Sequence, residues 1–283
     1  MINLPVLASA LALFATPAAA AGTFASDWSK GQKSAARLIA AGGLPGAVRA
    51  GIEIALDART HTYWRAPGDA GVPPLVSFEG SDNLASAELL FPAPQRMSEN
   101  GALTFGYDEA VVLPLAVSAL DSARPVTLAV KIDYAACERI CVPAQAMLRL
   151  VLPAGGEAGP HAAQLAQALA RVPQAGVVGG QGPLAIVALA YPPHASGAAP
   201  RIEIEARVPA GAKNLFVAPL APEGWFMQAG EPEAGGQDRR HFVVSIEQMP
   251  AGNAPGVQAS FVLVADGAAI EVKTTLDLGR LRP

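Results

Sequence analysis

The sequence lacks the features that mark several large classes of protein. Hydrophobic residues make up 51% of the chain, much of it alanine, but outside the N-terminus no apolar run reaches the roughly 18 residues that a membrane-spanning helix needs. Charged residues are sparse at 16%, and the net charge of −4 gives no reason to expect nucleic acid or an anionic membrane as a partner. No phosphate-binding glycine loop, dinucleotide fingerprint, Ser/His/Asp arrangement or H-E-x-x-H motif is present. We therefore expect a soluble protein that does not span a membrane, does not bind nucleic acid and needs no cofactor.

The first 21 residues differ from the rest of the chain. Residues 4–14 are apolar, and Pro17 is followed by a run of alanines that ends at Ala21. This is the pattern of a secretory signal peptide with an A-x-A cleavage site, although its first residues contain no Lys or Arg. A buried or anchoring helix is the alternative. We expect a signal peptide at residues 1–21 and a periplasmic mature protein, in a compartment where disulfides persist.

The rest of the chain has the pattern of short strands punctuated by glycine and proline. Apolar and polar residues alternate cleanly in several of these segments, as in half-buried strands. Expected strands cover residues 36–41, 48–57, 60–65, 85–91, 110–117, 126–134 and 146–152, then 184–191, 201–208, 214–218, 241–246, 258–265 and 270–276. The one convincing helical pattern lies at residues 161–171. The sequence therefore predicts an all-β protein with a sandwich at residues 22–153, a linker with a short helix at residues 154–175, and a second sandwich at residues 176–283.

Cysteine is scarce: the chain has only Cys137 and Cys141, separated by three residues. In an exported protein such a pair will usually be oxidised, but closing a five-residue ring stabilises a fold by only about 2 kcal/mol, against about 3 for a fifteen-residue ring. Small, strained and exposed disulfides are also the more easily reduced. Arg139 would favour the thiolate form, and Glu138 would oppose it. The spacing alone leaves an inert disulfide and a redox-active pair equally open.

A metal site is a third interpretation of the cysteines. Two thiolates and a distant histidine could hold Cu(I), which prefers soft ligands. The four histidines, His61, His161, His194 and His241, are scattered along the chain, and none lies near the cysteines in sequence. We therefore assign no metal site.

Several short blocks, in a fixed order, make the first half resemble a known family. The blocks are Ser26-Asp-Trp28, Ala36-Arg-Leu-Ile39, the stretch from His61-Thr-Tyr-Trp64 to Pro74, Gly80-Ser-Asp-Asn-Leu84, Phe91-Pro-Ala-Pro-Gln-Arg96, Phe105-Gly-Tyr107, Val111-Val-Leu-Pro114, and Asp133-Tyr-Ala-Ala-Cys-Glu-Arg-Ile-Cys-Val-Pro143. Over residues 26–153 the sequence resembles the N-terminal periplasmic domain of the thiol:disulfide interchange protein DsbD, in particular the variant found in suppressor-of-copper-sensitivity B proteins.

The resemblance implies an immunoglobulin-like sandwich that passes reducing equivalents through its cysteine pair, so the expected fold is two immunoglobulin-like β-sandwich domains. In that family the second cysteine forms mixed disulfides with partners, which here is Cys141, and Cys137 resolves them. A cap loop shields the pair, and the matching stretch offers Glu99, Phe105 and Tyr107. Partners in the family are periplasmic disulfide isomerases, cytochrome c maturation proteins and copper-resistance thioredoxin-like proteins.

The chain departs from the full family pattern because it contains neither the membrane segment nor the thioredoxin-like domain. We therefore expect a separate membrane electron donor and thioredoxin-like periplasmic partners. Tyr63 and Trp64 are adjacent on an expected strand and should point to opposite faces, one into the core and one toward the site. Tyr134 is expected either to pack over the disulfide or to be buried in the sandwich.

Two functions remain open from the sequence. The first is periplasmic thiol–disulfide exchange of the protein-disulfide reductase type, with the second sandwich as docking surface or spacer. The alternative is a non-enzymatic binding or scaffold module with a structural disulfide and a link to copper handling.

Overall fold

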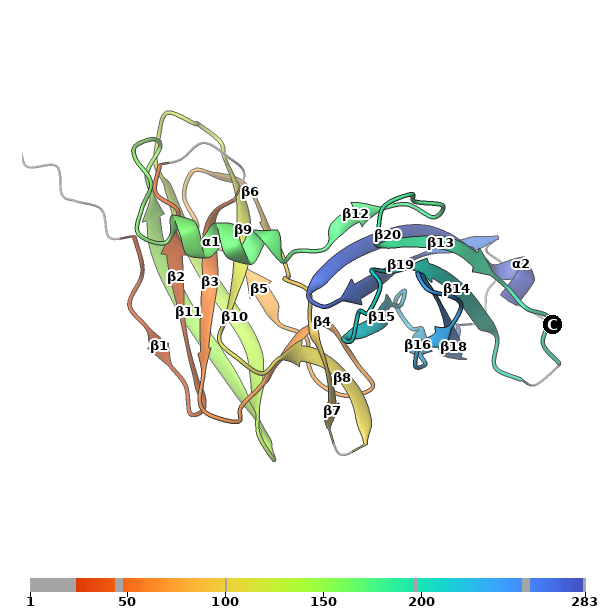
Figure 1. Ribbon diagram of the computed structural model, residues 1–283. Coiled ribbons are helices and arrows are strands. Elements are labelled where there is room, and N and C mark those ends of the chain that lie inside the picture. Colours follow the sequence, from red (N-terminus) through yellow and green to blue (C-terminus); the bar gives the residue numbers. More distant parts are fainter. Residues whose placement is uncertain (1–23, 44–47, 100, 196–197, 251–254, 282–283) are drawn as a thin grey trace, which may run out of the picture.

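The structure is a computed structural model that describes residues 24–43, 48–99, 101–195, 198–250 and 255–281. Two β-rich halves lie side by side, and a small sheet of the first half contacts the second (Figure 1). The expected signal peptide at residues 1–21 lies outside the described residues. Within the described ranges, no helix is long and apolar enough to cross a membrane.

The first half contains three antiparallel sheets. In spatial order, the first sheet consists of β1 (Ser29–Lys30), β2 (Ser34–Ala40), β3 (Val48–Leu56), β9 (Val111–Ala119) and β6 (Leu84–Leu89). The second consists of β11 (Cys141–Leu152), β10 (Val126–Cys137) and β5 (Leu75–Ser77). The third consists of β4 (Thr62–Gly68), β8 (Ala102–Tyr107) and β7 (Gln95–Glu99). Alternating apolar residues such as Ile52 and Ile54 of β3 are fully buried and pack in one core with Leu128 and Ile132 of β10. The first two sheets therefore form the sandwich that the period-two pattern predicts. We call the third one the cap sheet.

The helix α1 (Ala162–Ala170) packs on the outer face of the first sheet, against β3 and β9 (Figure 1). Leu165 is buried there with Ile39. Gly51 makes room for it, because a Cβ at that position would lie 2.6 Å from Leu165 Cδ2. The helix that the sequence places in a linker is thus packed against the first half.

The second half is a sandwich of two sheets. One sheet has the order β12 (Gln174–Gly176), β20 (Ala268–Asp277), β19 (Gly256–Ala265), β15 (Leu215–Leu220). The other has the order β13 (Ala185–Ala190), β14 (Arg201–Arg207), β18 (Arg239–Gln248), β16 (Phe226–Ala229), and β17 (Glu233–Ala234) also pairs with β18. The short helix α2 (Leu278–Leu281) follows β20. Ile202, Ile204 and Phe242 of one sheet share a core with Phe261 and Leu263 of the other. The prediction of an all-β protein built from β-sandwiches is confirmed.

The two halves meet where the cap sheet lies against β15, β19 and β20. Phe216, Val262 and Val264 belong to the core cluster of the first half, while their neighbours in sequence point into the second sandwich. Phe105 of the cap sheet stacks on Phe216 with ring centroids 5.5 Å apart. Strands covered on both faces carry apolar residues without alternation, which is why residues 215–219 are all buried.

Polar contacts connect the same surfaces. Arg65 pairs with Glu271 at 2.6 Å, and Gln228 donates a hydrogen bond to Asp69 at 2.8 Å. Arg96 forms a bidentate pair with the exposed Glu231. All three contacts join the cap sheet, or the turn that follows β4, to the second half.

The hairpin that carries the cysteines is longer than the sequence predicts. The expected strands ended at residue 134 and resumed at residue 146, with a corner before Pro143, whereas β10 and β11 pair continuously up to Cys137 and Cys141. The difference arises because β11 is an edge strand, where a proline, which has no N–H to donate, is tolerated.

Candidate redox site

The cysteines form the last pair of the β10–β11 hairpin. Their Cα atoms are 4.0 Å apart and their sulfurs are joined in a disulfide. The two residues differ in exposure: Cys137 is fully buried, whereas Cys141 is exposed. An incoming group can therefore approach Cys141 more readily than Cys137.

The tip of the hairpin, residues 138–140, is charged on one side and apolar at its end. Lys33 donates a 2.6 Å hydrogen bond to Glu138, and Arg59 lies 3.2 Å from the other carboxylate oxygen. The hydrogen bond from Lys33, followed by the charges of Lys33 and Arg59, lowers the pKa of Glu138. Lys33 and Arg59 thus balance the negative charge of Glu138. Ile140, at the end of the hairpin, has 76% of its surface exposed.

The chain entering β4 brings two polar side chains beside the disulfide. His61 and Cys137 exchange both backbone hydrogen bonds, at 2.8 and 2.9 Å, so β4 begins against the end of β10. Two residues on, the buried Tyr63 places its hydroxyl 3.2 Å from Cys141 Sγ and donates a 2.8 Å hydrogen bond to Glu99. Burial, followed by the hydrogen bond and the charge of Glu99, raises the pKa of Tyr63 far above its ordinary value, so the phenol keeps its proton at neutral pH.

Glu99 is the last residue of β7 and reaches the site from the cap sheet. Its carboxylate lies 3.5 Å from His61 Nε2 and 3.8 Å from Cys141 Sγ. A shallow cavity of about 540 Å³ opens beside it, lined by His61, Met97, Ser98, Glu99, Thr104, Glu138 and Arg139. The site therefore combines an exposed sulfur, an imidazole, a carboxylate and a phenol that donates a hydrogen bond to that carboxylate.

The structure brings some of the expected cap residues together and separates others. Glu99 and Tyr63 lie at the disulfide, as described above. Phe105 instead stacks on the second half, and Tyr107 is buried with its hydroxyl donating to the Pro92 carbonyl at 2.8 Å. Tyr134 is buried and its hydroxyl lies 2.8 Å from Ser34 Oγ. Phe105 and Tyr107, at the C-terminal end of β8, thus pack in the core and do not face the sulfurs.

Sequence reasoning passed over His61, which the structure places against Cys137. The signal was present, because residues two apart on a strand share a face and Tyr63 was already a candidate for the site. The expectation that Tyr63 and Trp64 point to opposite faces is confirmed: Trp64 is in the main core, whereas Tyr63 packs with Ala135 and Cys137. His61, Glu99 and Cys137 each offer a ligand atom, and these atoms all lie within 4.8 Å of one another.

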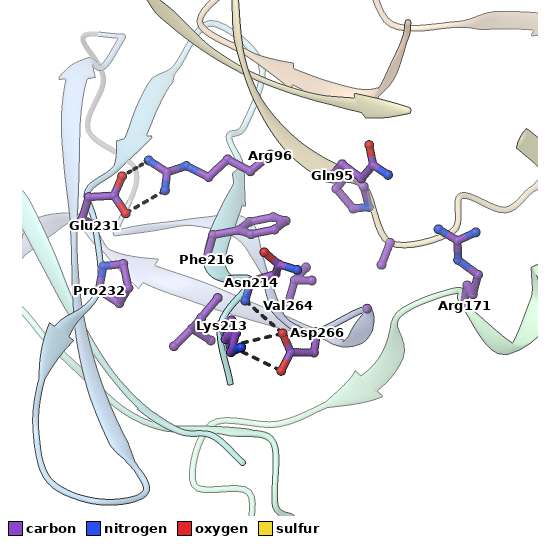
Figure 2. A pocket seen from close by; sticks show the side chains of 14 residues that line it. Gln95, Arg96, Arg171, Lys213, Asn214, Phe216, Glu231, Pro232, Val264 and Asp266 are labelled. Carbon is purple, nitrogen blue, oxygen red and sulfur yellow. Dashed lines mark hydrogen bonds and ion pairs between the residues drawn. The ribbon is translucent and has the colours of Figure 1, made fainter. Parts of the chain in front are cut away.

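A second cavity, of about 640 Å³, lies between the two halves (Figure 2). Arg96 crosses it to reach Glu231, and Asp266 accepts hydrogen bonds from the backbone N–H groups of Lys213 and Asn214. It contains no cysteine or histidine, so it is not the centre of thiol chemistry.

Comparison with known proteins agrees with this geometry. Residues 32–153 match the family model described as thiol:disulfide interchange protein DsbD, N-terminal. Over these residues the chain is similar to the DsbD N-terminal domain. The resemblance drawn from the sequence blocks is therefore confirmed.

A solved structure shares the fold over most of the chain. The N-terminal periplasmic domain of ScsB from Proteus mirabilis is 23% identical in sequence, with a TM-score of 0.66, and the match covers 90% of this chain and 98% of that one. The match extends well beyond residue 153, so the similar fold includes the second sandwich as well as the region that matches the family model. No curated protein matches the chain significantly.

Proposed function

We propose that this is a periplasmic thiol–disulfide exchange protein of the protein-disulfide reductase type that works through Cys137 and Cys141. The observation that carries the proposal is the unequal exposure of the two cysteines, one buried and one exposed at a hairpin end. The backbone ladder already pairs these two residues, so a disulfide between them closes a ring that adds only about 2 kcal/mol by the chain-entropy model. A bond with so small a structural contribution is better suited to being opened and closed.

The exchange reaction follows from the geometry. In the reduced protein, the Cys141 thiolate attacks a partner disulfide, forming a mixed disulfide and expelling the partner's other sulfur as a thiolate, which takes up a proton. The Cys137 thiolate then attacks Cys141 Sγ and releases the second partner sulfur. The pair ends oxidised and the partner reduced by two electrons. The Tyr63 hydroxyl lies 3.2 Å from Cys141 Sγ and donates its one proton to Glu99 in the oxidised protein. Turned from Glu99 to the sulfur in the reduced protein, the same proton would stabilise a thiolate there.

Thioredoxin-like periplasmic proteins are the proposed partners, because their exposed cysteine pairs are substrates for this two-step exchange. A separate membrane electron donor would reduce the pair again. Export through the signal peptide expected at residues 1–21 would place the protein in the periplasm, which is where the structurally similar ScsB domain is described to be. Cytochrome c biogenesis and copper tolerance are the pathways that such partners would serve.

Trapping of mixed disulfides tests the proposal. Mature Cys137→Ala protein retains only the exposed thiol, and we expect it to form discrete mixed disulfides with thioredoxin-like proteins of a periplasmic extract on non-reducing gels. Cys141→Ala, which retains only the buried thiol, is the matched control and should capture none.

The contrary result is equally defined. If neither variant captures a partner, and the wild-type disulfide has a reduction potential well below about −300 mV, the bond is a structural staple. The protein would then be the scaffold or binding module of the alternative hypothesis.

A further inference from the structure

We propose that the reduced protein binds one Zn²⁺ ion through Cys137, Cys141, His61 and Glu99. The site is distinct from thiol–disulfide exchange, although it uses the same two sulfurs. It requires only that the disulfide can be reduced, so it does not rest on the function proposed above.

The first observation is a cluster of ligand atoms from three separate elements. Atoms of His61, Glu99 and Cys137 all lie within 4.8 Å of one another, and Cys141 Sγ is bonded to Cys137 Sγ. In a tetrahedral zinc site, bond lengths of about 2.0–2.3 Å place neighbouring ligand atoms about 3.3–3.8 Å apart. The ligand atoms of His61, Glu99 and Cys137 therefore need to move by about an ångström. The two sulfurs need to move further, to a separation of about 3.8 Å, once their bond is broken.

The second observation is an unsatisfied imidazole nitrogen. His61 Nε2 is buried and has no hydrogen-bond partner, and the Glu99 carboxylate stands 3.5 Å away. A buried polar atom left unpaired costs free energy of about 1–3 kcal/mol. A metal ion between the imidazole and the carboxylate would satisfy both groups.

The backbone holds these ligands in place before any ion binds. The paired hydrogen bonds between His61 and Cys137 fix the start of β4 to the end of β10. The hairpin register fixes Cys141 opposite Cys137, with Cα atoms 4.0 Å apart. Two of the four ligands thus come from backbone positions hydrogen-bonded to each other, and Cys141 lies opposite Cys137 in the hairpin register. Glu99 reaches in from the end of β7.

The composition of the ligand set favours Zn²⁺ over Cu(I). Thiolate, imidazole and carboxylate are the three ligand types found in zinc sites. Cu(I) prefers soft sulfur ligands and would leave the Glu99 carboxylate unused. Two thiolates and one carboxylate carry three negative charges, of which Zn²⁺ neutralises two and Cu(I) only one.

Binding would depend on the redox state of the pair. Each thiol loses a proton to become a ligand, so Zn²⁺ replaces two protons at Cys137 and Cys141. In the disulfide, the sulfurs are bonded to each other and offer no thiolate. Zn²⁺ would therefore bind only the reduced form and would block attack by or on either sulfur while bound.

The test uses the full mature chain, reduced with a phosphine that is then removed anaerobically. Titration with Co²⁺ should give the thiolate-to-cobalt charge-transfer band and the visible absorption of tetrahedral coordination, and Zn²⁺ should displace both with a stoichiometry of one. The oxidised protein should show neither signal. We expect His61→Ala and Glu99→Gln each to weaken Zn²⁺ binding by about tenfold or more.

His194→Ala is the matched control, because His194 Nε2 is also buried without a hydrogen-bond partner but belongs to the second half. That variant should bind Zn²⁺ as the wild type does. Far-UV circular dichroism checks folding, and His61→Gln replaces His61→Ala if the latter does not fold.

Three outcomes would overturn the proposal: no binding by the reduced wild type, equal binding by the oxidised protein, or binding that His61 and Glu99 substitutions leave unchanged. Mixed-disulfide trapping by Cys137→Ala requires no metal, so a failure here is distinguishable from a failure of the proposed exchange function.

Discussion

Tyr107 shows how burial at a single residue sets the response of this protein to alkaline pH. Burial raises its pKa well above the ordinary value of 10.0, opposed in part by the positive charges of Arg171 and Arg65. The unfolded chain loses this proton near pH 10 while the folded protein retains it. Stability is therefore full below pH 10 and falls as the pH rises toward the folded-state pKa, by about 1.4 kcal/mol per pH unit for each such phenol.

Tyr107→Phe should remove this contribution. At pH 7 we expect a loss of about 1 kcal/mol, because the hydrogen bond to Pro92 is lost. Between pH 10 and 11 the variant should lose less stability than the wild type, as measured by denaturant unfolding at each pH. The assignment fails if Tyr107→Phe and wild type decline in parallel.

At the scale of single residues, the sequence predicts which side chains are chemically able to take part in the site, but it does not predict all of the residues that lie together there. Cys137 and Cys141 were named from their spacing, Tyr63 from its expected strand, and Glu99 from the cap loop that the resemblance implies. The structure places these four residues together. His61 was set aside because no cysteine is near it in sequence. Its contact with Cys137 arises from a single backbone bridge between distant segments, which local spacing does not encode.

At the scale of elements, the cap sheet is the part that sequence patterns predict least well. No strand was expected at β7 or β8, and the family resemblance implied a cap loop there. The apolar residues of these strands pack partly against the second half. Their hydrophobic pattern is therefore set by residues distant in sequence and not by one face of a local sheet. Most of the longer sandwich strands were predicted to within a few residues, apart from the end of the β10–β11 hairpin. The short strands β1, β5, β12, β16 and β17 were not predicted.

Gly106 is the position at which the cap sheet tolerates least change. A Cβ there would lie 2.1 Å from the Thr62 carbonyl oxygen, across the β4–β8 pairing. We expect Gly106→Ala to force β4 and β8 apart, to cost about 1–3 kcal/mol, and to displace Tyr63 and Glu99 from Cys141. The disulfide should then be reduced several-fold faster by dithiothreitol under native conditions, as followed by thiol release.

Gly155→Ala is the control for this substitution, since an added Cβ there meets nothing within 4 Å. That variant should match the wild type in stability and in reduction rate. A Gly106→Ala protein that is destabilised but reduced at the wild-type rate would show that the cap sheet does not shield the sulfurs.

At the scale of the whole molecule, the sequence predicts two sandwiches but not how they join. In the sequence, β15 and β19 are apolar runs without alternation, because one face of each strand points into the second sandwich and the other packs against the cap sheet. A run buried on both faces does not reveal what covers each face. The consequence is functional, since the sheet that carries Glu99 to the disulfide is also the surface on which the second half rests.

Phe216 is the residue that tests whether the second half supports the site. It is nearly fully buried in the interface, where it stacks on Phe105. We expect Phe216→Ala to cost about 3–5 kcal/mol and to weaken the contact between the halves. Amide hydrogen exchange in β7 and β8 should accelerate, and the single unfolding transition expected for the wild type should separate into two.

Phe242→Ala removes an equally large side chain from the interior core of the second sandwich. It should destabilise that sandwich without changing exchange in the cap sheet under native conditions. If the two variants affect β7 and β8 alike, the second half does not act on the redox site through this interface.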